Sequence, residues 1–303
     1  MMDKTDFQSK LTTLLPGLEL RCNELMAKHT SFRIGGPAEI MAFPKNCAEL
    51  AQLLNASALL DCKPAILGAG TNVLAPDAGM AGLVICLKDC MGGLEQIDAT
   101  AIRVGAGVTM TRAAVFAAGL GLAGMEFAHG IPGTVGGGVY MNAGAYGGEI
   151  CQICESVDVM RFDGTMETLS GEQMGFSYRH SRLEDEQGIV VSATFRLVAK
   201  PEDEIRQLMR ELMAKRSASQ PLDMPSAGSA FKRPVGGYAA ALIDQTGLKG
   251  FAIGNAAVSE KHAGFVVNLG GATADDVKRL LREVSDKVYS ATGLRLEPEV
   301  RIW

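Results

Sequence analysis

Hydrophobic and polar residues follow two patterns along the chain. Several stretches carry apolar residues at helical spacing, or charges placed to suit a helix. Others are short β-rich runs bounded by glycine or charged residues, which is typical of strands. The predicted helices lie within 3–28 (one or two short ones), 47–60, 110–127, 199–221, 237–246 and 273–293. The predicted strands lie within 64–75, 82–87, 101–108, 188–199, 250–255 and 264–269.

Local signals mark the ends of two predicted helices. One begins at Pro201 with acidic residues and ends near Lys215 and Arg216, so its charges suit the helix dipole. The last helix begins with Thr273 and Asp276 in the spacing of a capping box. Composition also shifts at Pro201, which predicts a domain boundary near residue 200. The mixture of elements predicts an α+β protein.

Composition and charge narrow the possible partners. The chain has 303 residues, which is long enough for two domains, and its 47% hydrophobic and 21% charged residues are ordinary for a globular protein. Its net charge of −5 offers no basic field to nucleic acid or to an anionic membrane. No apolar run approaches the roughly 18 residues of a membrane span, and the N-terminus lacks the features of a signal peptide. We therefore expect no nucleic-acid or membrane partner.

Cysteine and histidine spacings argue against a metal site. The seven cysteines are odd in number and scattered, which indicates reduced thiols and a cytoplasmic protein. Cys151 and Cys154 form a C-x-x-C without a second pair, and we interpret them as small buried residues rather than as metal ligands or a redox pair. The four histidines lack metal-binding spacing, and no phosphate-binding loop of the nucleoside triphosphatase type is present.

A run of glycines stands out at 130–148, GIPGTVGGGVYMNAGAYGG. It holds eight of the 36 glycines and no charge until Glu149, so its composition does not resemble that of a flexible linker. Glycines 133 and 136–138 would leave room for a planar or phosphorylated ligand to approach the backbone. A sharply turned, well-packed loop is the other interpretation.

A second glycine motif follows a predicted strand, LGAGTNVL at 67–74. Its successive backbone N–H groups could form an anion-binding nest for a pyrophosphate. The motif departs from the dinucleotide fingerprint, because the sixth position is Val73 and no clear βαβ unit follows. A tight turn between strands explains it equally well.

Three polar residues are further candidates. Arg179 lies in the polar turn FSYRHS, Ser229 in PSAGSAFKRP, and Glu299 in the apolar C-terminal run LRLEPEVRIW. Taken alone, they fit a surface charge, a turn serine and an exposed edge strand. No G-x-S-x-G elbow surrounds Ser229, which disfavours a hydrolase nucleophile.

In their order along the chain, these stretches resemble the UDP-N-acetylenolpyruvoylglucosamine reductase family. The resemblance spans roughly 270 residues. It rests on HTSFRIGGPAE, LGAGTNVL, GIPGTVGGGVYMNAGAYGGEI, FSYRHS, PSAGSAFKRP, AALIDQTGLKG, HAGFVVNLGGATADDV and LEPEVRI. The short connection between YRHS and TFRLV resembles the compact form of the family, which lacks an insertion carrying a substrate-binding tyrosine. Ala241 and Gly237 depart from the family pattern, so no role is carried over to them.

The resemblance implies a flavoprotein fold of the vanillyl-alcohol-oxidase type, an α+β fold with a smaller α/β substrate domain. The FAD-binding part would be residues 1–200, in two subdomains of about 1–75 and 76–200. The substrate-binding domain would be residues 201–290, and residues 291–303 would return as a strand to the FAD-binding part. We expect a monomer.

The resemblance also implies a reaction. FAD, bound non-covalently, would be reduced by NADPH, and hydride from its N5 would reach C3 of UDP-N-acetylglucosamine enolpyruvate. The product, UDP-N-acetylmuramate, is a peptidoglycan precursor. Arg179 and Glu299 would stabilise the developing negative charge, and Ser229 would give a proton to C2.

The same resemblance assigns binding residues. The implied substrate-binding residues are Tyr178, Lys232 and Tyr238. The implied cofactor-binding residues are Gly68, Ala69, Gly70, Thr71, Asn72, Gly130, Ile131, Pro132, Gly133, Gly136, Gly137, Asn142 and Ala143.

Two other functions fit these residues. One is a different FAD-dependent oxidoreductase of the same fold acting on a small alcohol or sugar, in which His129 is the candidate for a covalent flavin link. The other is a sugar-nucleotide-binding protein without redox activity, against which the joint presence of Arg179, Ser229 and Glu299 argues.

Overall fold

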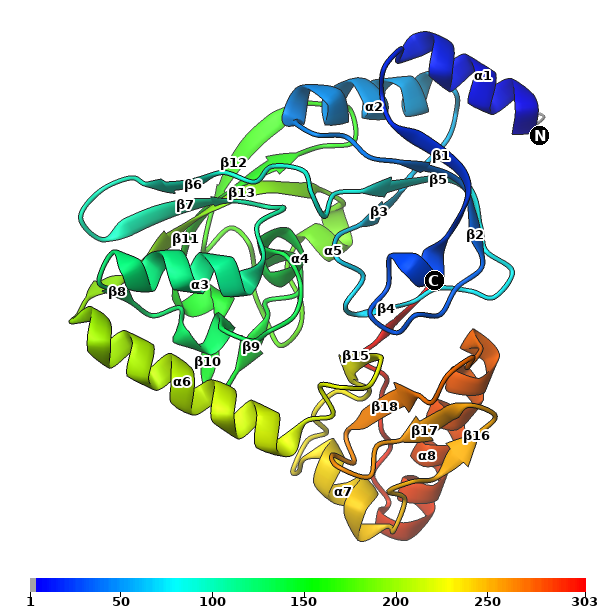
Figure 1. Ribbon diagram of the computed structural model, residues 1–303, viewed down its shortest axis with the longest axis vertical. Coiled ribbons are helices and arrows are strands. Elements are labelled where there is room, and N and C mark those ends of the chain that lie inside the picture. Colours follow the sequence, from blue (N-terminus) through cyan, green and yellow to red (C-terminus); the bar gives the residue numbers. More distant parts are fainter. Residues whose placement is uncertain (1–3) are drawn as a thin grey trace. The chain divides into compact units, whose positions relative to one another are not determined.

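A computed structural model describes residues 4–303 and contains both helices and strands, as predicted. Figure 1 shows the elements. The α-helices are α1 (Lys4–Leu14), α2 (Cys47–Leu59), α3 (Met110–Gly119), α4 (Val135–Tyr140), α5 (Leu183–Glu186), α6 (Glu202–Ser219), α7 (Ala239–Gln245) and α8 (Ala274–Thr292). Short 3₁₀ helices are η1 (Met26–Lys28), η2 (Glu126–Ala128) and η3 (Ile150–Gln152). Within residues 4–303, no helix combines the length and apolar character that crossing a membrane requires.

The packing divides the chain into two compact units. Unit 1 comprises residues 1–22, 40–69 and 82–215, and unit 2 comprises residues 23–39, 70–81 and 216–303. Helix α6 begins directly after Pro201, and its last four residues belong to unit 2. The division of the chain into cofactor-binding and substrate-binding parts stays a prediction.

Unit 1 contains a five-stranded antiparallel sheet. Its order is β12-β11-β13-β7-β6, and α3 and α4 lie near it (Figure 1). The strands are β6 (Leu94–Gln96), β7 (Ala101–Gly105), β11 (Cys154–Met160), β12 (Met166–Ser170) and β13 (Ile189–Arg196). Helix α4 packs on β13 and contributes Val135 and Val139, both fully buried, to the largest part of the core of this unit.

A four-stranded sheet of order β1-β2-β5-β3 contributes buried residues to a second core cluster. The strands are β1 (Leu20–Leu25), β2 (Pro37–Ala42), β3 (Ala65–Leu67) and β5 (Met80–Cys86). The cluster includes Leu50, Leu53 and Leu54 of α2, which confirms the helical spacing seen in the sequence. Shorter pairs join β8 (Leu122–Ala123) to β14 (Val198–Ala199) and β9 (Gly144–Ala145) to β10 (Gly148–Glu149).

Unit 2 is an antiparallel sheet covered by helices. The order is β15-β18-β17-β16, from β15 (Ser226–Ser229), β16 (Ala252–Ile253), β17 (Ala256–Val258) and β18 (Phe265–Asn268). Helix α8 packs on β16 and β17 and also contacts α7 (Figure 1). The predicted capping box of Thr273 and Asp276 is confirmed, and α8 ends at Gly293 in the left-handed conformation.

The C-terminal strand, β19 (Arg301–Ile302), pairs in parallel with β4 (Val73–Leu74). β4 directly follows the glycine motif of residues 68–72. The last residues of the chain therefore lie beside a segment predicted to bind the cofactor. The return of residues 291–303 to an FAD-binding part stays a prediction.

Some predicted elements differ in the structure. Of the one or two helices predicted within 3–28, α1 is present, and residues 20–25 form β1 at the edge of the four-stranded sheet. The helix predicted over 110–127 ends at Gly119, and residues 122–123 form β8. The glycine run was interpreted as irregular backbone, yet it contains α4. Here tertiary packing overrides local preference, since glycine disfavours a helix by up to about 1 kcal/mol per residue relative to alanine.

Candidate functional site

The glycines of α4 have two different environments. A Cβ on Gly136 would lie 2.9 Å from Ala106 Cβ, and one on Gly138 would lie 2.7 Å from Met110 Sδ. Both glycines therefore allow the helix to approach its neighbours in the protein closely. Gly137 is exposed, and the nearest atom to its Cβ position is Thr134 Oγ1, 3.8 Å away. Only Gly137 of the three leaves open space for a ligand.

Backbone contacts at the start of α4 restrict what the helix can bind. The N–H of Val135 donates to the carbonyl of Val108 at 2.8 Å, and the N–H of Gly136 donates to that of Ala106 at 2.9 Å. Thr134, buried at 3% exposure, caps the helix through Oγ1. These N–H groups are occupied by the protein, so contact of a ligand with Gly136 would have to use other atoms.

The two glycine motifs meet within unit 1. A Cβ on Gly68, at the end of β3, would lie 3.2 Å from Thr134 Oγ1, so the start of the LGAGTN turn lies against the capping residue of α4. Gly68, which is predicted to bind the cofactor, thus lies beside Thr134 of the glycine run although 66 positions separate them.

The rest of the LGAGTN turn lies in unit 2. Gly70 has φ +62°, and a Cβ there would come within 2.1 Å of the His29 carbonyl oxygen, so only glycine fits. Asn72 contacts the C-terminal strand at two points: its Nδ2 donates to the carbonyl of Glu299 at 3.3 Å, and its own carbonyl accepts from the N–H of Arg301 at 2.9 Å.

Arg179 occupies a tight turn in unit 1. Ser177 and His180 exchange two backbone hydrogen bonds, of 3.1 and 3.2 Å, around Tyr178 and Arg179, and Arg179 has φ +55°. Its guanidinium donates from Nη2 to the carbonyl of Gly144 at 3.1 Å and lies over the Tyr178 ring, 5.0 Å from the centroid.

Three hydrogen bonds fasten this turn to the glycine run. Besides the bond from Arg179 to Gly144, Ser181 Oγ donates to the carbonyl of Tyr140 at 2.7 Å, and Asn142 Nδ2 donates to the carbonyl of Ser177 at 2.9 Å. Ser181 and Thr134 are not among the predicted site residues. Thr134 had a usable signal, because a threonine before an apolar-glycine run is a typical helix N-cap. Nothing local pointed to Ser181.

Ser229 and Glu299 are neighbours in unit 2. The N–H of Glu299 donates to the carbonyl of Ala230 at 2.9 Å, and that of Lys232 donates to the carbonyl of Glu297 at 2.8 Å. The chain after β15 therefore pairs with the segment before β19. Ser229 ends β15 and is exposed, and Glu299 is half-buried. This pairing brings together two predicted catalytic residues that are 70 positions apart in the sequence.

The predicted substrate-binding residues are accessible. Tyr178 is 49% exposed and Tyr238 is 63% exposed, with the guanidinium of Arg233 4.0 Å from the centroid of the Tyr238 ring. Lys232 is half-buried, and its Nζ lies 3.5 Å from Glu297 Oε2. The roles of all three residues stay predictions.

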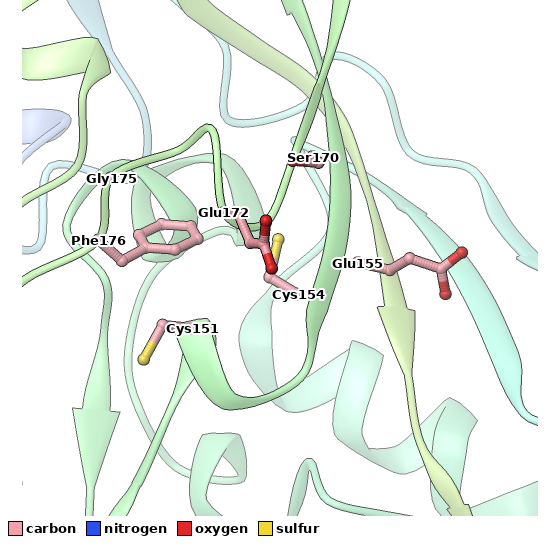
Figure 2. A pocket seen from close by; sticks show the side chains of 8 residues that line it. Cys151, Cys154, Glu155, Ser170, Glu172, Gly175 and Phe176 are labelled. Carbon is pink, nitrogen blue, oxygen red and sulfur yellow. The ribbon is translucent and has the colours of Figure 1, made fainter.

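A pocket of about 550 Å³ in unit 1 is lined by Cys151 and Cys154 (Figure 2). Burial, followed by the nearby Glu149, raises the pKa of the Cys151 thiol, and burial raises the pKa of the Cys154 thiol to about 12. Both thiols are therefore protonated at neutral pH and are poor nucleophiles. Cys154 is buried as predicted, but Cys151 is exposed, so the interpretation of both as buried residues is wrong for Cys151.

Comparison with known proteins identifies the fold and the family. The family model described as FAD binding domain matches residues 38–170, and the C-terminal domain model of UDP-N-acetylenolpyruvoylglucosamine reductase matches residues 220–303. The chain is 45% identical to the UDP-N-acetylenolpyruvoylglucosamine reductase of Agathobacter rectalis, over 98% of each chain. It is 44% identical to that of Latilactobacillus sakei, over 94% of this chain and 93% of the relative.

A solved structure agrees with this relationship. The crystal structure of UDP-N-acetylenolpyruvylglucosamine reductase from Thermus caldophilus is 35% identical and has a TM-score of 0.78, over 94% of this chain and 98% of that one. The predicted fold class, an α+β flavoprotein fold, is confirmed. The chain belongs to the UDP-N-acetylenolpyruvoylglucosamine reductase family.

Proposed function

We propose that this protein reduces UDP-N-acetylglucosamine enolpyruvate to UDP-N-acetylmuramate, with FAD as cofactor and NADPH as reductant. The observation that carries the proposal is the attachment of the Arg179 turn to the glycine run by three hydrogen bonds. A fixed cation thereby belongs to the same unit as Gly68 and the glycine run, which are predicted to bind FAD. A negative charge that develops on a substrate beside the cofactor needs such a fixed partner.

The residues of unit 1 fit a flat, phosphorylated cofactor. Gly137 presents exposed backbone where a Cβ would fill open space, and Gly68 lies against Thr134 at the start of the same helix. We propose that the segments around Gly68 and Gly137 hold FAD. The chemistry that bound FAD supplies is hydride transfer, from NADPH to N5 and from N5 to the enolpyruvyl C3.

The proposed catalytic residues then act on charge and protons. Arg179 and Glu299 stabilise the negative charge of the enolate and carboxylate, and a preorganised donor such as the Arg179 guanidinium contributes about 3–4 kcal/mol. Ser229 gives a proton to C2. A serine hydroxyl is a weak acid, but an enolate is a strong base, and the half-buried Lys232 three positions away assists the transfer.

Binding of the substrate is assigned to three further residues. We propose that Lys232, Tyr238 and Tyr178 contact the sugar nucleotide. Tyr238 and Tyr178 offer large exposed aromatic surfaces, and Lys232 offers a cation. We further propose that the protein is cytoplasmic, because the reductant and the sugar nucleotide are metabolites of the cytoplasm. We also propose that it is a monomer. Light scattering of the purified protein tests the oligomeric state.

An absorbance spectrum of the purified protein tests the proposed activity. We expect flavin bands that NADPH bleaches under anaerobic conditions and that UDP-N-acetylglucosamine enolpyruvate restores. A protein that is reduced by NADPH but not reoxidised by this substrate would refute the proposed reaction.

The mode of cofactor attachment needs a separate test. We propose non-covalent FAD and therefore expect acid precipitation to leave the yellow colour in solution. Colour that stays with the protein would favour an oxidase of the same fold. His129, beside Gly130, is the first residue to test for the covalent link.

A further inference from the structure

Asn142 lies at the junction of three segments that carry the proposed site. It follows α4, precedes β9, and is 1% exposed. Its backbone has φ +43°, a conformation that asparagine tolerates better than most residues. A buried amide in a left-handed conformation implies that its side chain makes specific contacts.

The side chain of Asn142 makes three hydrogen bonds within unit 1. Nδ2 donates to the carbonyl of Ser177 at 2.9 Å and to Glu149 Oε2 at 3.2 Å, and Oδ1 accepts from the N–H of Cys151 at 3.0 Å. These partners define the orientation of the amide, because the opposite orientation would place its NH₂ against an N–H and its oxygen against two oxygens. Both hydrogens of the amide nitrogen are thus used inside the protein. A contact of Asn142 with the cofactor would therefore come from its backbone or from Oδ1.

The carbonyl of Ser177 is the point at which the Arg179 turn is held. It accepts hydrogen bonds from the N–H of His180 and from Asn142, so Asn142 anchors the first residue of the turn. The guanidinium of Arg179 is held at the other side by the carbonyl of Gly144, two positions after Asn142. Glu149, the third partner, pairs with Gly144 in the β9–β10 hairpin. The backbone of the turn and the acceptor for its guanidinium are thereby set by one buried amide.

We propose that Asn142 is a positioning residue for Arg179, which deepens and rests on the proposed function. It sets the backbone from which the guanidinium reaches the developing charge. A displacement of a catalytic group by about 1 Å costs about 100-fold in rate. The loss should therefore appear in the step that needs Arg179, measured as the rate of reoxidation per bound FAD.

Asn142→Gly is the variant of choice. Glycine accepts the positive φ without strain and removes all three side-chain hydrogen bonds. Asn23→Gly is the matched control, because Asn23 is an exposed asparagine with φ +52° in β1. We expect reoxidation of the reduced holoenzyme by the enolpyruvyl substrate to slow about 100-fold in Asn142→Gly and to stay unchanged in Asn23→Gly.

A double-mutant cycle separates positioning from a general structural role. If Asn142 acts through Arg179, adding Asn142→Gly to Arg179→Ala should cause no further loss in reoxidation rate. Losses that multiply would overturn the proposal. A parent enzyme that is not reoxidised would instead refute the proposed function.

Limited trypsin digestion tests the same idea without the substrate. The bond after Arg179 lies in an accessible turn, and cleavage there requires the turn to open. We expect faster cleavage after Arg179 in Asn142→Gly, followed by mass spectrometry, with no change in Asn23→Gly. Equal rates in the parent and Asn142→Gly would show that Asn142 does not hold the turn, whatever the reaction catalysed.

Discussion

Adjacent glycines of α4 should respond in opposite ways to the same substitution. In Gly137→Ala the new Cβ has no neighbour closer than 3.8 Å, so the alanine only improves helix propensity. We expect the free energy of unfolding of the FAD-free protein to rise by about 0.5–1 kcal/mol. In Gly136→Ala the new Cβ comes 2.9 Å from Ala106 Cβ and 3.2 Å from Ala106 O. Such overpacking costs about 1–3 kcal/mol, which exceeds the gain in propensity.

The effect of the Gly137 variants on FAD affinity should be opposite to the effect of Gly137→Ala on stability. If Gly137 lies against the cofactor, an added methyl group there creates a clash of about 1–3 kcal/mol. This clash raises the dissociation constant for FAD about 5- to 150-fold. The larger side chain of Gly137→Val should lower FAD occupancy further. Gly137→Ala would then be a protein that folds better and binds its cofactor worse.

Two measurements on each variant check this reasoning. Urea unfolding of the FAD-free protein gives the stability, and titration with FAD, followed by quenching of flavin fluorescence, gives the dissociation constant. Unchanged FAD affinity in both Gly137 variants would refute the placement of α4 against the cofactor. A Gly136→Ala protein as stable as the parent would refute the packing argument.

Three further predictions concern single residues. Ser229→Ala and Glu299→Gln should leave reduction by NADPH intact but slow reoxidation by the enolpyruvyl substrate by about two or more orders of magnitude. Stopped-flow absorbance measures both half-reactions, and parent-like rates of both in either variant would contradict the assigned role. Burial lowers the pKa of His262, whose Nδ1 accepts from the N–H of Gly264 at 3.1 Å. The unfolded state therefore binds the proton first as pH falls below about 7, and stability is lost from there down to the lowered pKa. Urea unfolding at pH 7.5 and 5.5 should show a smaller loss in His262→Asn than in the parent, and equal losses would contradict the argument. Asp77 accepts hydrogen bonds of 2.7 and 3.1 Å from the first turn of α8, so Asp77→Ala should lower the free energy of unfolding by about 0.5–2 kcal/mol, whereas an unchanged urea midpoint would count against this cap.

Elements with strong local signals were predictable. Helix α8 carries a capping box at Thr273, an amphipathic pattern and Gly293 at its end, and all three act within a few residues of the chain. Helices α2 and α6 and strand β13 are similar cases. Strands β11 and β12 were not predicted, although the alternation of Val157, Asp158 and Val159 in β11 is a strand signal; β11 pairs with β12 and β13.

The residues of the candidate site could be predicted only in part from the sequence. Arg179, Ser229 and Glu299 could be assigned by the resemblance of their motifs, although none carries a distinctive signal alone. The residues that hold these motifs could not be assigned. Ser181 is a plain serine in the sequence, and its bond to Tyr140 spans 41 positions.

The family, the order of the motifs and the helices and strands with local signals follow from the amino-acid sequence. That three glycines in a row form part of a helix follows only from the packing, since Val135 and Val139 gain more by burial against β13 than the glycines lose in propensity. The packing also decides that Asn142 contacts the turn of Arg179 rather than solvent. Such contacts depend on which distant segments fold together, and no local pattern records that.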